Sequence, residues 1–224
     1  MARANSGNFM APRCRLAFSD ALFEARAFEG GKPKFGATFI FDTDAVGLLV
    51  EKLEAVGIKE WGKERYERMR GPRNTLPLLT PEALRRIKWP LLDGDGPQAR
   101  AKESGALHNG FGPGKIFIRA NTSDDSVPVE MRSKDKYTPA GKAEMYSGCY
   151  VRPVINVYAW VHPASGPGMS FGLSFIQKVA EGESLGGRAP INVDQWYIPD
   201  AYEDDEDEDY TRVADKSGAG SVYD

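Results

Sequence analysis

Two segments of the chain alternate between two kinds of side chain, and this period of two limits the fold more than any other feature. Along residues 115–121 (KIFIRAN) and 150–161 (YVRPVINVYAWV), every second residue is apolar or small. Successive side chains of a β-strand point to opposite faces, so each segment is predicted to be a strand with one buried face. The predicted core faces hold Ile116, Ile118 and Ala120, and Val151, Pro153, Ile155, Val157, Ala159 and Val161.

Three further segments have the composition of strands. Residues 34–42 (KFGATFIFD) are rich in aromatic and β-branched residues, and residues 169–180 alternate like the first two segments. Residues 127–133 are predicted to form a short edge strand, because proline is tolerated at a sheet edge and Pro128 stands in this segment.

Helices are predicted between these strands. Residues 44–69 carry apolar residues at helical spacing, with Gly57 as an expected interruption. Residues 80–89 (TPEALRRIKW) are predicted to form a short helix that begins at an N-capping threonine and ends before a proline. Residues 92–114 are glycine-rich and are predicted to form a long loop.

The spacing of these elements favours one fold class. Regular crossover helices do not separate the strands, which argues against a doubly wound parallel sheet. The sequence therefore predicts a mainly β fold with inserted helices (α+β). We expect a five-stranded OB-fold antiparallel barrel with a helical insertion around residues 44–90.

The charges of the chain divide it into two parts. Residues 200–224 hold ten acidic and two basic residues, whereas residues 1–199 hold 22 acidic and 27 basic residues. A segment with a net charge of −8 and few apolar residues cannot form a core, so we expect a disordered acidic tail over 200–224. The mildly basic part, 1–199, is the predicted folded domain, and a basic surface attracts polyanions.

Several classes of protein are disfavoured. No apolar run is long enough for a membrane-spanning helix, and the start of the chain has no apolar leader, so we expect a cytoplasmic location. Cys14 and Cys149, the only cysteines, lie far along the chain from His108 and His162. This spacing does not predict a zinc site, and two buried thiols are the expectation.

The second face of the two alternating strands carries the chemistry. It mixes aromatic with basic residues: Lys115, Phe117 and Arg119 on one strand, and Tyr150, Arg152, Tyr158 and Trp160 on the other. Single-stranded nucleic acid requires this mixture, because bases stack on aromatic rings for about 1–3 kcal/mol each. Lysine and arginine contact the phosphates. The sequence leaves open the alternative that these rings pack beneath a helix.

Two loops add to this predicted nucleic-acid-binding set. Lys32 and Lys34 stand in one glycine-rich loop. A second loop, bounded by proline and glycine, suits a clamp on a flexible strand and holds Arg132, Lys134, Lys136 and Tyr137. The sequence predicts no catalytic residue, no metal site and no cofactor.

Two alternatives remain open at this point. A metal-dependent nuclease is suggested weakly by Asp124 and Asp125 followed by Glu130 and Arg132. An arginine stands there where such sites need a lysine, and arginine does not give up its proton. The other alternative is a protein-interaction module whose working part is the acidic tail. The oligomeric state, a homo-oligomer included, is also open.

Three segments, in this order, resemble a family of phage single-stranded DNA-binding proteins. They are LFEARAFEGGKPKFGATFIFD (22–42), YSGCYVRPVINVYAW (146–160) and GLSFIQKVAEGESLGG (172–187). The resemblance covers most of residues 12–197. It implies an OB-fold, non-specific coating of single-stranded DNA during phage replication or recombination, and a location in the host cytoplasm.

The tail is also similar to the acidic tails of bacterial and phage single-strand binders, which contact replication proteins. We expect it to modulate DNA access and to recruit such partners. It differs in that its acids lie well before the end, and the chain closes on Tyr223 and Asp224 instead of a phenylalanine. The candidate autoinhibitory or partner-binding residues are Glu203, Asp204, Asp205, Glu206, Asp207, Glu208, Asp209, Tyr223 and Asp224.

Overall fold

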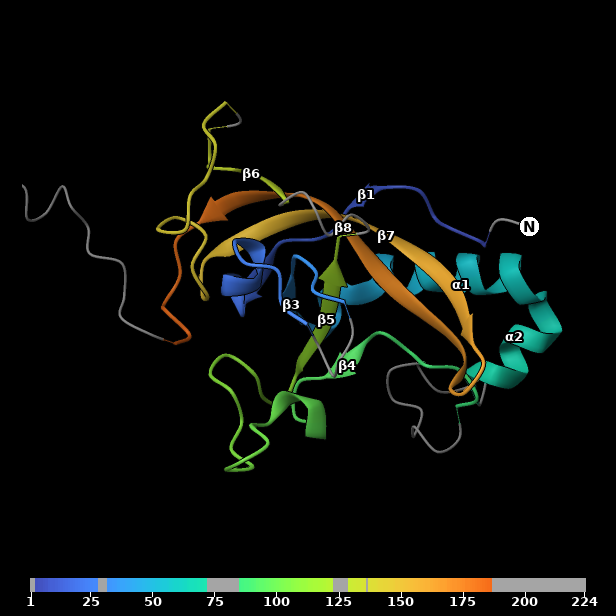
Figure 1. Cartoon of the computed structure of the whole chain (residues 1–224). Coiled ribbons are helices and arrows are strands. Elements are labelled where there is room, and N and C mark those ends of the chain that lie inside the picture. Colours follow the sequence, from blue (N-terminus) through green and yellow to red (C-terminus); the bar gives the residue numbers. More distant parts are fainter. Residues whose placement is uncertain (1–2, 28–31, 72–84, 123–128, 136, 187–224) are drawn as a thin grey trace, which may run out of the picture. The chain divides into compact units, whose positions relative to one another are not determined.

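The structure of the chain is a computed structural model that describes residues 3–27, 32–71, 85–122, 129–135 and 137–186 (Figure 1). Its strands are β1 (Phe9–Met10), β2 (Cys14–Ala17), β3 (Gly36–Asp42), β4 (Leu92–Asp93), β5 (Lys115–Asn121), β6 (Glu130–Arg132), β7 (Tyr150–His162) and β8 (Gly166–Ala180). Its helices are α1 (Gly47–Trp61) and α2 (Lys63–Arg70), with 3-10 turns η1 (Ser19–Leu22), η2 (Thr43–Val46) and η5 (Pro97–Ala99). The boundary that the sequence predicts near residue 199, and the acidic tail, lie outside the described residues.

Five strands close into a barrel, because β7 pairs with both β2 and β8 and so joins the two ends of the sheet. The order around the barrel is β7-β2-β3-β5-β8. Neighbouring strands are antiparallel except β5 and β8, which pair in parallel. The closed five-stranded barrel confirms the predicted OB-fold, with β1 and β6 added outside it and β4 paired with β5.

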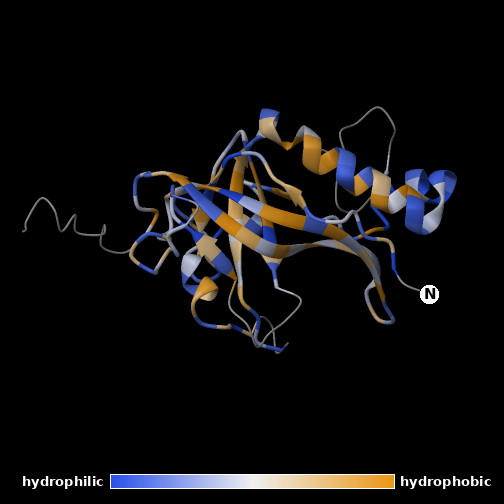
Figure 2. Cartoon of the chain, turned by 90° about the horizontal axis from the view of Figure 1, so that it is seen from above, coloured by the Kyte–Doolittle hydropathy of each residue, from blue (hydrophilic) through white to orange (hydrophobic). Residues whose placement is uncertain are grey.

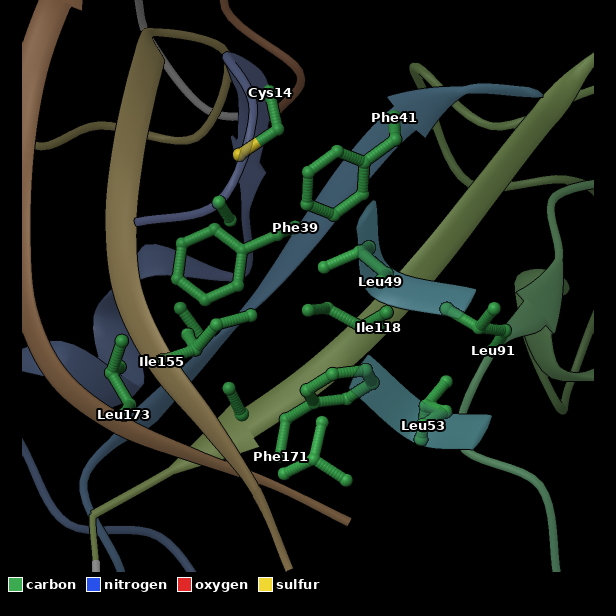
Figure 3. Packing of buried hydrophobic residues seen from close by; sticks show 14 of the residues in the cluster. Cys14, Phe39, Phe41, Leu49, Leu53, Leu91, Ile118, Ile155, Phe171 and Leu173 are labelled. Carbon is green, nitrogen blue, oxygen red and sulfur yellow. The ribbon is translucent and has the colours of Figure 1, made fainter. Parts of the chain in front are cut away.

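The alternating pattern of the sequence explains the core of this barrel. Ile116, Ile118 and Ala120 of β5 point inward, as do Ile155 of β7 and Phe171 of β8. Figure 3 shows Ile118, Ile155 and Phe171 converging on one apolar interior. Figure 2 shows apolar and polar stretches alternating along the barrel strands and along α1.

The predicted helical stretch forms two helices instead of one that breaks at Gly57. α1 runs through Gly57 and ends at Trp61; the next residue, Gly62, has a φ of 77°, in the left-handed region that favours glycine. Leu49 and Leu53 of α1 belong to the barrel core, and Figure 3 shows both pointing into the same interior as the barrel side chains. The expected break was wrong because the missing side chain at Gly57 makes room for the ring of Tyr66 on α2.

The short helix predicted over residues 80–89 is wrong for its described part, residues 85–89, which are irregular. Instead of continuing a helix, Lys88 donates its backbone N–H to the carbonyl of Pro167 and accepts a bond from the N–H of Met169. These bonds fasten the segment to the β7–β8 hairpin. The predicted loop over residues 92–114 is mostly irregular, with β4 and η5 inside it. Within the described part of the chain, no helix is long and apolar enough to cross a membrane.

Candidate nucleic-acid interface

The outward-facing residues of the barrel stand in rows, because strand register fixes which residues lie opposite one another. Tyr150 on β7 stands opposite Arg15 on β2, and Arg15 stands opposite Ile40 on β3. Ile40 in turn stands opposite Phe117 on β5. The row therefore joins an aromatic and a basic residue at one end to apolar side chains in its middle.

A hollow of about 320 Å³ lies at the aromatic end of this row. It is lined by Arg13, Arg15, Lys115 and Tyr150, among others. The guanidinium of Arg13 stacks on the ring of Tyr150, with its central carbon 4.2 Å from the ring centroid. The ammonium of Lys115 pairs with Asp42. We name this site the first hollow; its lining combines the three cations Arg13, Arg15 and Lys115 with the ring of Tyr150, and it also includes Phe41 and Asp42.

Arg15 also fastens the last described residues to this site. Its Nη2 donates to the carbonyl of Glu183 at 2.6 Å, and its Nε donates to the carbonyl of Gly148 at 3.3 Å. Nearby, the backbone N–H of Leu185 donates to the carbonyl of Ser147 at 2.8 Å. The chain at residues 183–185 therefore runs beside the first hollow.

A second hollow, of about 240 Å³, lies where β5, β7 and β8 meet residues 88–92. Its lining includes Arg119 of β5, Tyr158 of β7, Lys88 and Trp89. Trp89 is buried, and its indole N–H has no hydrogen-bond partner among the described residues. The second hollow therefore brings two of the predicted residues, Arg119 and Tyr158, together with a lysine and an indole that the sequence interpretation did not include.

Trp160 lies half-buried on the outer face next to this hollow. Its Nε1 donates to the hydroxyl of Ser170 at 2.8 Å, which fixes the orientation of the indole. The ring lies against Gly168, where any side chain would overlap it. The glycine thus allows the indole to lie close to the backbone of β8.

The middle of the outer face is covered, and this corrects one predicted contact. Residues 92–111 together with Leu185, here called the cover, pack on an apolar patch of β2, β3 and β5. The buried cluster consists of Ala17, Ile40, Ala99 and Phe117, with Leu92, Leu107, Phe111 and Leu185 packed against it. Phe117 is only 1% exposed, so the expectation that its ring faces a bound strand is wrong for this structure. Burial of its ring stabilises the fold by about 1.5–3 kcal/mol.

The predicted basic loop is partly engaged in contacts of its own. Arg132 pairs with Glu130 at 2.6 Å and also donates to the carbonyl of Tyr137 at 3.2 Å. The side chain of Tyr137 is 74% exposed, and Lys134 is exposed as well. Lys136 lies outside the described residues. The loop thus presents an aromatic ring and a lysine to solvent but lines neither hollow.

The remaining predicted residues are scattered. Lys32 and Lys34 lie exposed between β2 and β3, and Arg152 lies exposed on β7. None of the three lines either hollow. The candidate residues of the acidic tail lie outside the described part of the chain.

The cysteines and acids of the described residues form no metal-binding group. No three His, Cys, Asp or Glu side chains in that part of the chain could hold a metal ion together. Cys14 and Cys149 are buried free thiols. Burial raises the pKa of Cys149 to about 11 and that of Cys14 well above its ordinary value, so both stay protonated at neutral pH.

Several residues of the two hollows, and one aromatic contact of the cover, were not predicted from the sequence. Arg13 directly precedes β2, and Arg15 lies in it. The strand has only four residues, which is too few to show an alternating pattern. Lys88 stood in the predicted helix. Phe18 and His108 lie in irregular segments, yet their rings meet at 5.1 Å between centroids. The only feature of the sequence that could have indicated these residues was the pair of arginines on either side of Cys14.

Known structures share this fold. A single-stranded DNA-binding protein from bacteriophage Enc34, solved in complex with ssDNA, matches with a TM-score of 0.53 and 16% identity. The match covers 83% of this chain and 96% of that chain. Another structure of the Enc34 protein matches with a TM-score of 0.51 and 17% identity, over 88% of this chain and 96% of that one. No curated protein matches the sequence.

The sequence itself carries the family relationship. A family model described as "Enterobacter phage Enc34, ssDNA-binding protein" matches residues 9–211 of the 224 residues. The match spans nine tenths of the chain and confirms the resemblance seen in its three segments. This chain is a member of the Enc34 ssDNA-binding protein family.

Proposed function

We propose that this chain binds single-stranded DNA without sequence preference and coats it during phage replication or recombination in the host cytoplasm. The observation that carries the proposal is the pair of hollows on the outside of an OB-fold barrel, each with aromatic and cationic side chains. Membership in the Enc34 family supports it, as does a relative of the same fold solved with ssDNA.

Cations from both hollows hold the phosphates of the bound strand. Lys115 in the first hollow and Arg119 in the second stand four residues apart on β5, roughly 13 Å along the strand. Their charges, with those of Arg13 and Lys88, hold the sugar–phosphate chain through salt-dependent contacts. Because phosphates are common to all sequences, binding of this kind is non-specific.

The aromatic residues supply the preference for single strands. Tyr150, Tyr158 and Trp160 lie half-buried on the outer face, each held by a neighbouring strand or side chain. Unpaired bases stack on such rings, whereas the bases of a duplex are already stacked on each other. The loops with Lys32 and Lys34, and with Arg132, Lys134, Lys136 and Tyr137, are proposed to add contacts at the edges, and Arg152 adds one on β7.

The acidic tail competes with DNA in this proposal. A segment of net charge −8 joined to the domain has a high local concentration near its basic face. The path of residues 183–185 beside the first hollow supports this arrangement. Once DNA displaces the tail, Glu203 to Asp209 are free to bind a replication protein, with Tyr223 and Asp224 as its terminal contact.

A series of gel shifts tests the proposal. Single- and double-stranded oligonucleotides of equal length are titrated with the full chain and with a chain ending at residue 199, at several salt concentrations. We expect tighter binding of the single strand, weaker binding as salt rises, and a gain in affinity at low salt without the tail.

Three outcomes would contradict parts of the proposal. Absence of binding to either DNA would leave an interaction module as the better explanation. Equal affinity with and without residues 200–224 across the salt series would remove tail competition while leaving DNA binding intact. Recovery of shortened oligonucleotide only in the presence of Mg²⁺ would show cleavage, which a pure binder does not catalyse.

A further inference from the structure

Phe18 is the residue whose geometry the fold alone does not explain. It is 49% exposed, although most large apolar side chains of the barrel are buried. Its φ of 52° makes it the one non-glycine residue with positive φ among the described residues. For a bulky residue this backbone costs roughly 1–3 kcal/mol and persists only where the surroundings enforce it.

The surroundings do enforce it. Directly before Phe18, Ala17 is buried beneath the cover. Directly after it, Ser19 donates its backbone N–H to the hydroxyl of Ser147 at 3.0 Å, and the two hydroxyls lie 3.1 Å apart. The backbone is therefore fixed on both sides while the aromatic ring is held at the surface.

The ring is supported by an array of aromatic residues that leads down to the barrel. Phe18 meets His108 at 5.1 Å with an angle of 89° between the rings, and Phe111 lies 6.1 Å from both. Phe111 in turn packs edge-on against Phe117 of β5 at 5.0 Å. These angled contacts brace the exposed ring from below, and no ring among the described residues stacks parallel on Phe18.

The charges around this ring suit a polyanion. The carboxylate of Asp20, two residues after Phe18, lies 3.6 Å from Nη2 of Arg26 and 3.7 Å from Nζ of Lys142. Two cations therefore share this one acid. Paired backbone hydrogen bonds of 3.0 Å hold Arg26 against Lys34, and Lys32 is exposed close by in the chain. Arg26, Lys34 and Lys142 thus supply cations around this connection, alongside the acids Asp20 and Glu24.

We propose that Phe18 is a stacking platform for one nucleobase of single-stranded DNA, with Arg26 and Lys34 holding the flanking phosphates. The platform lies on the connection between β2 and β3, outside both hollows, and its support comes from the cover. The inference rests on the proposed function and adds a third point of contact to it. It also gives the cover a role, since His108 and Phe111 brace the ring.

The test compares the full chain with its Phe18→Gly and Phe18→Trp variants. Glycine adopts a positive φ without steric strain, so in Phe18→Gly the relieved backbone strain offsets the lost ring contacts with His108 and Phe111, and the variant should still fold. Fluorescence polarisation measures the affinity of each for oligo(dT) and for an abasic deoxyribose–phosphate strand of equal length. Thermal unfolding confirms that each variant is folded.

The platform predicts a specific pattern of affinities. Phe18→Gly should weaken binding of oligo(dT) roughly fivefold to a hundredfold, the loss expected for one stacked base. The same variant should bind the abasic strand as the parent does. Phe18→Trp should keep the parent affinity. Ile58→Ala, which truncates another exposed apolar side chain, on α1 and 40% exposed, should change neither affinity.

Other outcomes separate this inference from the proposed function. If the parent chain itself fails to bind oligo(dT), the proposed function is lost. If the parent binds and Phe18→Gly binds equally well, only the platform is refuted, and the exposed ring is left for a protein contact. An equal loss on oligo(dT) and the abasic strand would also overturn it, because the ring would then act through the fold and not through stacking.

Discussion

Gly57 decides how α1 and α2 meet. Glycine within a helix normally costs about 1 kcal/mol relative to alanine, because it gains more freedom on unfolding. Here the empty space beside its Cα is filled by the ring of Tyr66, which is 1% exposed. Burial also raises the pKa of Tyr66, so its hydroxyl stays protonated. The close fit of ring on glycine explains why a helix former is absent at this position.

Replacing Gly57 with alanine should therefore destabilise the chain, by about 1–3 kcal/mol in the free energy of unfolding, because a new Cβ overlaps the Tyr66 ring. Gly47 at the start of α1 is the matched control, since nothing lies within 4 Å of a Cβ built there and its φ is −52°. Urea denaturation should find Gly47→Ala as stable as the parent or slightly more stable. Equal effects of the two changes would show that packing on Tyr66 is unimportant.

At the scale of the element, the length of each strand decides whether the sequence shows its alternation of buried and outward-facing residues. β5, β7 and β8 each have seven or more residues, so their alternation is visible and the core face of β5 was predicted correctly. On β7 the prediction fails at Val161, which is 46% exposed near the end of the strand, and on β8 a register shift buries Ile176 in place of Phe175. β1 and β2 have two and four residues, which is too short for a period. They form because they pair with β7, a tertiary contact that no local pattern encodes.

The same limit explains the errors in the site. Phe117 stands at an outward position of β5, as its alternation predicts, yet it is buried. Its burial comes from the cover, which is irregular and carries no period that could indicate where it packs. The apolar neighbour Ile40 on β3 stands opposite Phe117, but this is known only once the register of the two strands is known.

The N-terminal segment at Arg3 and Ala4 is bound to α1 through the carboxylate of Glu60. Glu60 accepts hydrogen bonds from the backbone N–H of Ala4 at 2.7 Å and from Nη1 of Arg3 at 2.8 Å. The backbone bond to Ala4 and then the bond to Arg3 lower the pKa of Glu60. Folding therefore favours its charged form, and this contribution is complete at neutral pH and disappears as the pH falls below about 4.

Glu60→Gln should consequently lower the free energy of unfolding by about 1 kcal/mol at pH 7, because a charged acceptor becomes neutral. The difference between variant and parent should shrink as the pH falls into the acid range, because the parent carboxylate then becomes protonated. Urea denaturation at the two pH values provides the check. A difference that is the same at both would show that the charge of Glu60 is irrelevant to the attachment.

At the scale of the whole molecule, the proposed interface exists only after folding. The first hollow draws on β2, β3, β5 and β7, and the second draws on β4, β5, β7, β8 and the segment before β4. No short stretch of sequence contains either one. Closure of the barrel brings these strands to one outer face, and the cover between the hollows separates them.

The central claim is that DNA is held by the cations of these hollows and not by positive charge in general. The double variant Lys88→Gln with Arg119→Gln removes two charges from the second hollow. The double variant Lys59→Gln with Lys63→Gln removes two charges from α1 and α2, at exposed positions that line neither hollow. Both variants have the same net charge, so long-range attraction of DNA falls equally in the two.

The decisive measurement is the affinity of the parent and both double variants for oligo(dT) over a series of salt concentrations. The account predicts that the second-hollow variant binds more weakly, and that its plot of log affinity against log salt is less steep by about 1.4, since each lost phosphate contact removes about 0.7. The helix variant should keep the slope of the parent. Equal slopes and equal affinities for the two double variants would contradict the account.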